Sequence, residues 1–176
     1  MTADQAAKAK LAGIRALAMD VDGVLTDGGL WWGSSGEELK RFCFADIMGV
    51  SLARRAGLSL ALISGEDSPL VDRYAEKMLI RHTVKGCRDK AAALGQFAAE
   101  AGLPLSDVCF MGDDINDLAA IDLAGFSAAP SNASPVVRER VQFVAKNTGG
   151  NGAVRELVDA ILAARGLTAE DVFRRP

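Results

Sequence analysis

The sequence predicts an α/β fold built around one parallel sheet, and two observations support this prediction. Short apolar runs rich in Val, Ile, Leu and Phe alternate along the chain with alanine-rich segments of helical period. The connections between them are short, and no repeat, low-complexity tract or linker interrupts the alternation. We therefore expect a single domain over residues 1–176, with a core at 14–162 and a C-terminal tail at 165–176.

Six apolar runs are predicted to form the strands of this sheet. They span residues 15–20, 59–64, 80–84, 108–112, 126–129 and 142–145. Helices are expected between the strands, several of them closed by a glycine that can take the left-handed conformation at the C-cap. The helical segments span residues 46–57, 68–78, 88–102, 115–125 and 150–166.

One stretch interrupts this alternation. Residues 28–44, GGLWWGSSGEELKRFCF, contain two short strand-like segments around a Gly-Ser turn, which predicts a β-hairpin inserted after the first strand. Its apolar side chains exceed what one face of a two-stranded ribbon can bury. They are Leu30, Trp31, Trp32, Leu39, Phe42 and Phe44. We therefore expect another surface to cover the hairpin.

Composition narrows the class of protein. Hydrophobic residues make up 49% of the chain and charged residues 24%, which is typical of a globular domain and excludes wholesale disorder. The net charge is -3 and the basic residues are scattered, so no nucleic-acid partner is expected. No apolar run has the length of a signal-peptide core or a membrane span, so no membrane association is expected. The three cysteines are widely spaced, which favours reduced thiols in a cytoplasmic protein.

Polar side chains collect at the predicted carboxyl ends of the strands, where a parallel sheet forms its ligand crevice. Carboxylates that converge there from two strands repel each other unless a hard divalent cation lies between them, and Mg²⁺ suits such a site. The segments are Asp20-Val21-Asp22-Gly23, Ser64-Gly65-Glu66 and Gly112-Asp113-Asp114, with Lys90 at the start of the helix after strand 80–84. The sequence therefore predicts a magnesium site with a hydroxyl and an ammonium beside it.

This set of groups favours phosphoryl transfer. Ser64 and Lys90 can donate hydrogen bonds to phosphate oxygens. A carboxylate can then attack the phosphorus atom, and the two-residue offset between Asp20 and Asp22 places a second carboxyl near the leaving oxygen as a general acid. We expect transfer of a phosphoryl group to Asp20, followed by hydrolysis.

The same residues resemble, in order and spacing, the four motifs of the haloacid dehalogenase (HAD) superfamily of aspartate-nucleophile phosphatases. The motifs are DVDGVLTDG, a Ser-Gly after the next strand, an isolated Lys and GDDINDLAAI. The small size, GEELKRF on the hairpin and GGNGAVREL near the C-terminus resemble the subfamily of 3-deoxy-D-manno-octulosonate 8-phosphate phosphatases, which includes related 2-keto-3-deoxy-nonulosonate 9-phosphate phosphatases. Over residues 14–162, the resemblance implies a Rossmann-like core without a separate cap domain, Mg²⁺ as cofactor and a sugar-acid phosphate as substrate.

The resemblance also implies a role for each matching residue. Asp20 would be the nucleophile and a metal ligand. Asp22 would be the general acid and base, contact the phosphate and give its backbone carbonyl to the metal. The remaining roles are metal binding by Asp113, phosphate binding by Ser64, Gly65 and Lys90, substrate contact by Asp46 in the loop 43–47, and support by Asp114 and Asp117.

Two positions bear on the choice of sugar acid. Octulosonate phosphatases generally carry one arginine directly after the glycine of the second motif and another about eight residues later, both suited to an anionic substrate. Glu66 and Tyr74 stand at these positions here, with Arg73 one residue away. A glutamate at the first position resembles the nonulosonate branch, which places that acid near sugar hydroxyls. The eight-carbon and the nine-carbon substrate both stay open, with Glu66 as a candidate specificity residue.

Two other functions use similar residues. A phospho-receiver signalling domain also combines an acidic magnesium site with a Ser or Thr and a lysine, but its acidic pair is on the first strand and its acceptor aspartate on a middle one. Here the acidic cluster recurs late, in GDDIND, and Lys90 precedes it. A non-catalytic module that binds sugar phosphates is the other alternative, and the presence of all four motif residues argues against it.

The chain is too short to insert a cap domain, because Asp20 and Ser64 are separated only by the hairpin and one helix. A site open to water needs a lid, and the apolar hairpin needs a partner. The resemblance implies a homotetramer whose hairpins pack together and whose neighbouring subunits form walls around each site. It also implies a role in the supply of lipopolysaccharide precursors. In some relatives the C-terminal tail reaches an active site, which would bring Arg174 and Arg175 to the substrate.

Overall fold

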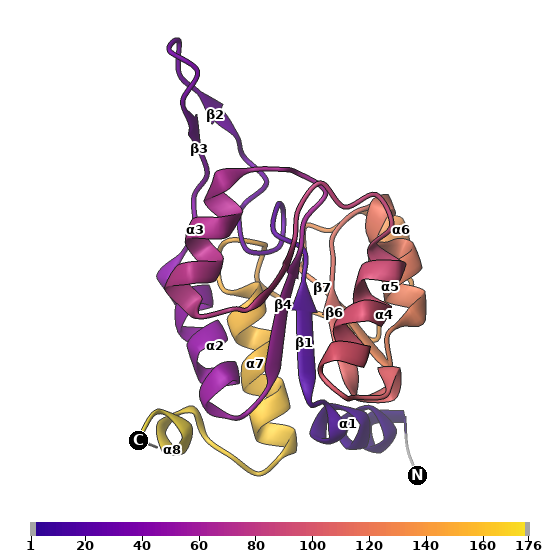
Figure 1. Ribbon diagram of the computed structural model, residues 1–176. Coiled ribbons are helices and arrows are strands. Elements are labelled where there is room, and N and C mark those ends of the chain that lie inside the picture. Colours follow the sequence, from indigo (N-terminus) through magenta and orange to yellow (C-terminus); the bar gives the residue numbers. More distant parts are fainter. Residues whose placement is uncertain (1–2, 175–176) are drawn as a thin grey trace.

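The computed structural model describes residues 3–174, and its core is a six-stranded parallel sheet (Figure 1). The strand order is β5-β4-β1-β6-β7-β8, and every neighbouring pair is parallel. The strands are β1 Ala16–Met19, β4 Ser59–Ile63, β5 His82–Val84, β6 Val108–Met111, β7 Phe126–Ala129 and β8 Phe143–Val144. Each strand lies within one of the predicted runs, so the predicted α/β fold is confirmed.

Helices cover both faces of the sheet (Figure 1). One face carries α2 Phe44–Arg55, α3 Pro69–Met78 and α7 Ala153–Ala164, and the other carries α4 Lys90–Glu100, α5 Leu118–Leu123 and α6 Pro135–Arg138. Short turns of 3₁₀ helix at Leu105–Asp107 and Ile115–Asp117 precede β6 and α5. Within the described part of the chain, no helix combines the length and apolar character needed to cross a membrane.

The core forms on both faces because side chains alternate along each buried strand. In β1, Leu17 and Met19 belong to a cluster that includes Leu157 of α7. Ala16 and Ala18 belong to the cluster on the opposite face. Burial on both faces explains why these strands are continuous apolar runs in the sequence.

Two helices outside the predicted set, α1 Ala3–Gly13 and α8 Ala169–Phe173, extend the first of these clusters. Leu11 of α1 and Val172 of α8 are both buried in it. The predicted C-terminal tail therefore folds back as α8, at the end of the sheet opposite to the carboxyl ends of the strands (Figure 1). Arg174 pairs with Glu170 at 2.5 Å, and Arg175 lies outside the described residues.

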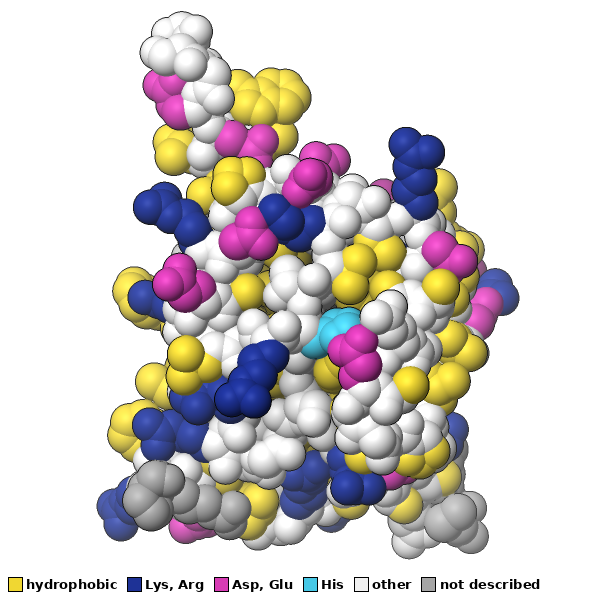
Figure 2. Space-filling model, in the orientation of Figure 1, with side chains coloured by type: hydrophobic (Ala, Val, Ile, Leu, Met, Phe, Trp, Pro, Cys, Tyr) yellow, Lys and Arg dark blue, Asp and Glu magenta, His cyan; other side chains and the backbone are white. Residues whose placement is uncertain are grey.

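The predicted hairpin is present as β2 Trp31–Trp32 and β3 Glu38–Leu39, which pair antiparallel. It projects from the body at the end of the sheet where β1 and β4 finish (Figure 1). The side chains of Trp31 and Trp32 are 71% and 76% exposed, and hydrophobic side chains stand out on the hairpin in Figure 2. Phe42 does not share this surface, because its ring stacks on Tyr74 with centroids 4.7 Å apart.

Helices α2 and α7 pack closely at Gly49. A Cβ atom at this position would lie 2.7 Å from the Cα of Arg155, which is backbone that cannot move aside easily. Gly95 in α4 differs, because a Cβ atom there would meet nothing within 4 Å. The two helical glycines therefore form a matched pair.

We predict opposite effects of alanine at these two positions. Gly49→Ala should lower the free energy of unfolding by about 1 to 3 kcal/mol because it overpacks the contact between α2 and α7. Gly95→Ala should raise it by about 0.5 to 1 kcal/mol because alanine favours a helix interior. Urea unfolding followed by circular dichroism measures both changes, and a loss of stability at Gly95 as large as that at Gly49 would contradict the packing argument.

Candidate active site

The predicted site residues meet at the carboxyl ends of the central strands. Strand β1 lies between β4 and β6. After β1 the chain adds β4 and β5 on one side of it and then β6, β7 and β8 on the other, so the strand order reverses next to β1. Open α/β sheets bind ligands at such a reversal. Asp20 directly follows β1, Ser64 follows β4, and Asp113 comes two residues after β6. Lys90 is the first residue of α4.

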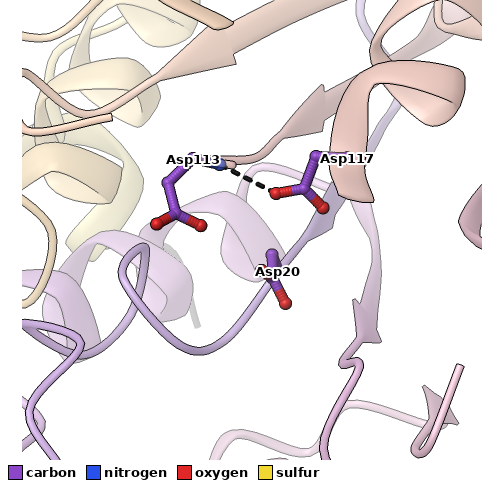
Figure 3. A group of neighbouring side chains, drawn as sticks. All are labelled: Asp20, Asp113 and Asp117. Carbon is purple, nitrogen blue, oxygen red and sulfur yellow. Dashed lines mark hydrogen bonds between the residues drawn. The ribbon is translucent and has the colours of Figure 1, made fainter. Parts of the chain in front are cut away.

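Three carboxylates form the centre of this site (Figure 3). Asp20, Asp113 and Asp117 each place one carboxylate oxygen within 4.8 Å of the others. One Asp117 oxygen accepts hydrogen bonds from the backbone N–H groups of Asp113 at 2.9 Å and Asp114 at 3.2 Å. Asp117 thus fixes the loop that carries the other acidic residues.

The buried ammonium group of Lys90 lies between two of these carboxylates. Its Nζ is 3.0 Å from Asp20 and 2.6 Å from Asp117, and its side chain is 1% exposed. Burial lowers the pKa of Lys90, but attraction to Asp20 and Asp117 outweighs this, and the net pKa is raised. Lys90 is therefore held as a cation beside the predicted nucleophile.

The carboxylates keep an excess of negative charge. Burial, and then repulsion from Asp117, raises the pKa of Asp20 to about 7 despite the opposing effect of Lys90. Burial and the Asp20, Asp117 and Asp114 carboxylates raise the pKa of Asp113 to about 8. Three carboxylates share one ammonium here, and a divalent cation can balance the remaining charge.

The residues present fit Mg²⁺. Both Asp117 oxygens are already bound, one by Lys90 and one by two amides, so this side chain suits support rather than ligation. The Asp113 carboxylate lies against the turn after β1, where a Cβ at Gly23 would be 2.1 Å from its oxygen. Asp20 and Asp113 are the two carboxylates that would hold the ion, and the family resemblance adds the backbone carbonyl of Asp22. Mg²⁺ prefers a site with few carboxylates and several open positions.

A cleft of about 450 Å³ opens above this centre. Ser64 directly precedes Gly65, which lines the cleft; its side chain is buried, and its Oγ accepts a hydrogen bond from the backbone N–H of Glu66 at 3.1 Å. The hydroxyl hydrogen remains available to a phosphate oxygen. The residues that line the cleft are Asp20, Asp22, Gly65, Glu66, Cys87, Arg88, Asp113, Asp114 and Asn116.

Sequence reasoning missed two residues at this site. One is Arg88, whose cationic side chain lines the wall of the cleft. It could have been predicted from the sequence, because it stands only two residues before Lys90. Lys40, which comes from the hairpin, lies 2.8 and 3.0 Å from the two carboxylate oxygens of Asp22. No local pattern indicates that contact, because 18 positions separate the two residues.

Asp46 is not brought to the cleft. It is 1% exposed, and its carboxylate accepts hydrogen bonds from the backbone N–H groups of Gly152 and Arg155, both at 3.0 Å, and from the Cys43 thiol. The backbone N–H groups at the start of a helix lack acceptors within the helix. Asp46, which lies on α2, provides the acceptor oxygens for the start of α7. This position differs from that of the substrate contact implied by the family resemblance.

Asp114 also has a local structural task. It is exposed, and its side chain accepts a hydrogen bond from the backbone N–H of Ile115 at 2.7 Å as the N-cap of the 3₁₀ turn Ile115–Asp117. With Asp117 it completes a reciprocal capping box. Both residues therefore hold the acidic loop in shape, in keeping with the supporting roles expected for them.

The GGNGAVREL motif lies against the loop after β1. A Cβ at Gly149 would be 1.8 Å from the carbonyl oxygen of Gly23, and the N–H of Gly150 donates to Val24 at 3.0 Å. A segment far along the chain thus supports the loop that carries Asp22.

Comparison with known proteins gives concordant results. A model of haloacid dehalogenase-like hydrolases matches residues 76–157. The 3-deoxy-D-manno-octulosonate 8-phosphate phosphatase KdsC of Escherichia coli K12 is 36% identical over 166 residues, which are 94% of this chain and 87% of the relative.

Two solved structures are similar over nearly their whole length. One is the crystal structure of 3-deoxy-D-manno-octulosonate 8-phosphate phosphatase from Moraxella catarrhalis in complex with a magnesium ion, a phosphate ion and KDO. It has a TM-score of 0.89 and 38% identity, over 92% of this chain and 93% of that chain. The other is the cobalt-bound form of the corresponding phosphatase from Haemophilus influenzae, with a TM-score of 0.86 and 36% identity, over 89% and 92% of the two chains.

The raised pKa values predict how pH changes Mg²⁺ binding. In metal-free protein, the contribution of the two carboxyls to stability is greatest below their ordinary pKa of 3.8, and it is lost as the pH rises to about 7 for Asp20 and about 8 for Asp113. Because Mg²⁺ displaces up to two protons, its affinity should rise by about 10- to 100-fold per pH unit near pH 6, and by less than about tenfold per unit as the pH reaches 8.

Thermal unfolding with and without Mg²⁺ at pH 6 and pH 8.5 measures this effect as a larger Mg²⁺-induced rise in Tm at the higher pH. Asp113→Asn should abolish most of the rise. The matched variant Asp122→Asn removes a surface carboxylate that pairs with Arg140, and it should retain the rise. An equal rise at both pH values in the unsubstituted protein would contradict the prediction.

Proposed function

Because the chain belongs to the haloacid dehalogenase-like hydrolases, in the family of the 3-deoxy-D-manno-octulosonate 8-phosphate phosphatases, we propose that it is a Mg²⁺-dependent phosphatase of a 2-keto-3-deoxy sugar acid. One observation carries the proposal. Buried Asp20 lies 3.0 Å from the Lys90 ammonium at the floor of an open cleft, and Asp22 lines the same cleft two residues further on. The arrangement supplies a nucleophile, a phosphate-binding cation and a general acid.

The first half of the reaction transfers the phosphoryl group to the protein. An Asp20 oxygen attacks phosphorus, the bond from phosphorus to the sugar oxygen breaks, and the Asp22 carboxyl gives its proton to that leaving oxygen. Lys90, the Ser64 hydroxyl and the Gly65 backbone hold the phosphate oxygens. Bound Mg²⁺ would neutralise negative charge on the phosphoryl group and on Asp20.

The second half regenerates the nucleophile. The Asp22 carboxylate takes a proton from water as the water oxygen attacks the phosphorus of the aspartyl phosphate. The bond from phosphorus to the Asp20 oxygen then breaks, which leaves inorganic phosphate and the free Asp20 carboxylate. Asp22 ends this step protonated, as the next cycle requires.

The alternatives are not favoured. A phospho-receiver domain has its acceptor aspartate after a strand from the middle of the chain. Here Asp20, the buried acid 3.0 Å from Lys90, follows β1, the first strand in chain order. A non-catalytic sugar-phosphate module would not need an acid that lines the cleft next to the nucleophile, as Asp22 does.

The substrate is 3-deoxy-D-manno-octulosonate 8-phosphate or a nine-carbon 2-keto-3-deoxy-nonulosonate 9-phosphate, with the eight-carbon ester preferred on the strength of the family. Glu66 lines the cleft and can accept hydrogen bonds from sugar hydroxyls, while Arg88 offers a cation to the anionic substrate. Tyr74 is 4% exposed and stacked on Phe42, so it does not reach the cleft. Arg73 lines a neighbouring groove together with Glu66.

We further propose a homotetramer in the cytoplasm that supplies lipopolysaccharide precursors. The exposed hairpin supports the assembly, because the Lys40 that follows it contacts Asp22 at the wall of the cleft and because residues 3–174 leave its tryptophans exposed. Walls contributed by neighbouring subunits would exclude water from the open cleft. Cys43, Cys87 and Cys109 are free thiols, which supports a reducing compartment.

A phosphate-release screen tests the substrate and the nucleophile together. The unsubstituted protein with Mg²⁺ should hydrolyse the eight-carbon or nine-carbon sugar-acid phosphate with a higher kcat/KM than hexose phosphates. Asp20→Asn should lower kcat by about 1,000-fold or more, because an amide cannot form the aspartyl phosphate. Asp27→Asn keeps the oxygen that accepts from Gly29 in the same loop, and it should retain activity. Substantial turnover by Asp20→Asn would overturn the assignment of the nucleophile.

The hairpin surface is tested by the double variant Trp31→Ser/Trp32→Ser. Light scattering should show a species smaller than a tetramer, and kcat/KM should fall by about tenfold or more because the cleft loses its walls. Leu79→Ser removes an apolar side chain that is 65% exposed elsewhere on the molecule, and it should change neither quantity. A fully active monomer of the unsubstituted protein would contradict the proposed assembly.

A further inference from the structure

We infer that Lys40, at the base of the hairpin, is a positioning residue for the general acid Asp22. The inference rests on the proposed phosphatase function and extends it to a residue outside the four motifs. The Lys40 ammonium lies closest to Asp22, with Glu38 further away at 3.8 Å, so we expect it to act on the reaction through the Asp22 carboxyl group.

Lys40 and Asp22 are in close contact, and the Lys40 side of the pair is shielded from solvent. The Lys40 Nζ lies 2.8 Å from one Asp22 oxygen and 3.0 Å from the other, so one ammonium binds both oxygens of the ionised carboxylate. When Asp22 carries a proton, one oxygen can still accept from Lys40 while the other donates to the leaving oxygen. The Lys40 side chain is only 3% exposed, whereas that of Asp22 is 30% exposed at the wall of the cleft. A partly exposed carboxyl group would otherwise be free to turn into solvent, and Lys40 restricts that motion.

The segment that carries Lys40, directly after β3, is itself fixed on both sides of this residue. Glu38 accepts a hydrogen bond from the Ser68 hydroxyl at the N-cap of α3, at 2.8 Å. Arg41 donates to the carbonyl of Gly150 at 2.9 Å and to the Asn151 side chain at 3.0 Å. With its neighbours anchored to two other segments, the Lys40 ammonium has a defined place from which to hold Asp22.

Proton transfer makes this position matter. A general acid must lie within hydrogen-bond reach of the leaving oxygen, and a displacement of about 1 Å can cost about 100-fold in rate. Loss of Lys40 should therefore slow reactions that need a proton on the leaving group. It should matter little for a leaving group that departs as a stable anion.

The test compares two substrates in the full-length protein with Mg²⁺. One is the best sugar phosphate found in the screen, whose alkoxide leaving group needs a proton, and the other is p-nitrophenyl phosphate, whose phenolate does not. Lys40→Met should lower kcat for the sugar phosphate by about 10- to 100-fold with KM changed by less than about threefold, and lower kcat for the aryl phosphate by less than about threefold.

Matched variants separate positioning from general damage. Lys85→Met removes a lysine that pairs with two surface carboxylates, Asp72 at 2.6 Å and Asp67 at 3.0 Å, and should leave both kcat values unchanged. Lys40→Arg should recover most of the loss because it keeps a charged donor for Asp22. In the Asp22→Asn background, Lys40→Met should cause no further loss, because the acid on which Lys40 acts is already gone.

Equal losses on both substrates, no loss on the sugar phosphate, or a further loss in the Asp22→Asn background would each overturn the inference. If Lys40→Met does not fold by circular dichroism, Lys40→Leu, which also removes the donor, is held to the same criteria. Hydrolysis of neither ester by the unsubstituted protein would instead overturn the proposed function, so the two failures are distinguishable.

Discussion

The structure depends on the compensation of negative charge buried at the carboxyl ends of β1 and β6. Asp20 and Asp117 are almost inaccessible to water, and such groups persist only when they are paired and hydrogen-bonded. Lys90 pairs with both, while the second Asp117 oxygen binds two backbone amides of the acidic loop. Asp117 is therefore satisfied by the protein itself, but Asp20 and Asp113 are not, as their raised pKa values show. The division leaves one part of the cluster rigid and the other ready for a divalent cation.

The sheet brings this cluster together from segments that are distant in the sequence. Because all six strands are parallel, the residues that follow β1, β4 and β6 meet at one edge of the sheet, although they are far apart in the sequence. The loop after β1 then needs support from outside, since it contains no regular structure between β1 and the hairpin. Gly149 and Gly150 supply this support by close backbone approach, and Arg41 ties the hairpin base to the same segment. Segments that are 109 positions apart in the chain, at Arg41 and Gly150, thus help to define the position of the loop that carries Asp22.

Much of this was predictable because it depends on patterns that a linear sequence carries. Strands buried on both faces are apolar runs, and the residues that follow them are polar. The sheet and the positions of Asp20 and Ser64 could therefore be predicted from the sequence. Helices α1 and α8 escaped prediction because each contributes little more than Leu11 or Val172 to a core that other elements form. The contact of Lys40 with Asp22 escaped it because only the folded path of the hairpin brings them together. The position of Asp46 under α7 likewise depends on the packing of two helices far apart in the sequence.

The hairpin carries the surface proposed for assembly and ends next to a contact with the proposed general acid, and residues 3–174 form no separate cap domain. Its paired strands expose Trp31 and Trp32, which residues 3–174 leave uncovered, and Lys40, directly after β3, lies against Asp22. Glu38, which pairs with Trp32, is fixed to the N-cap of α3. A partner that packs on the tryptophans therefore restricts the same ribbon that holds the general acid. In the proposed tetramer, the association that walls the cleft would also steady the proton donor, so one element would serve two tasks that a separate cap domain and a core would otherwise divide.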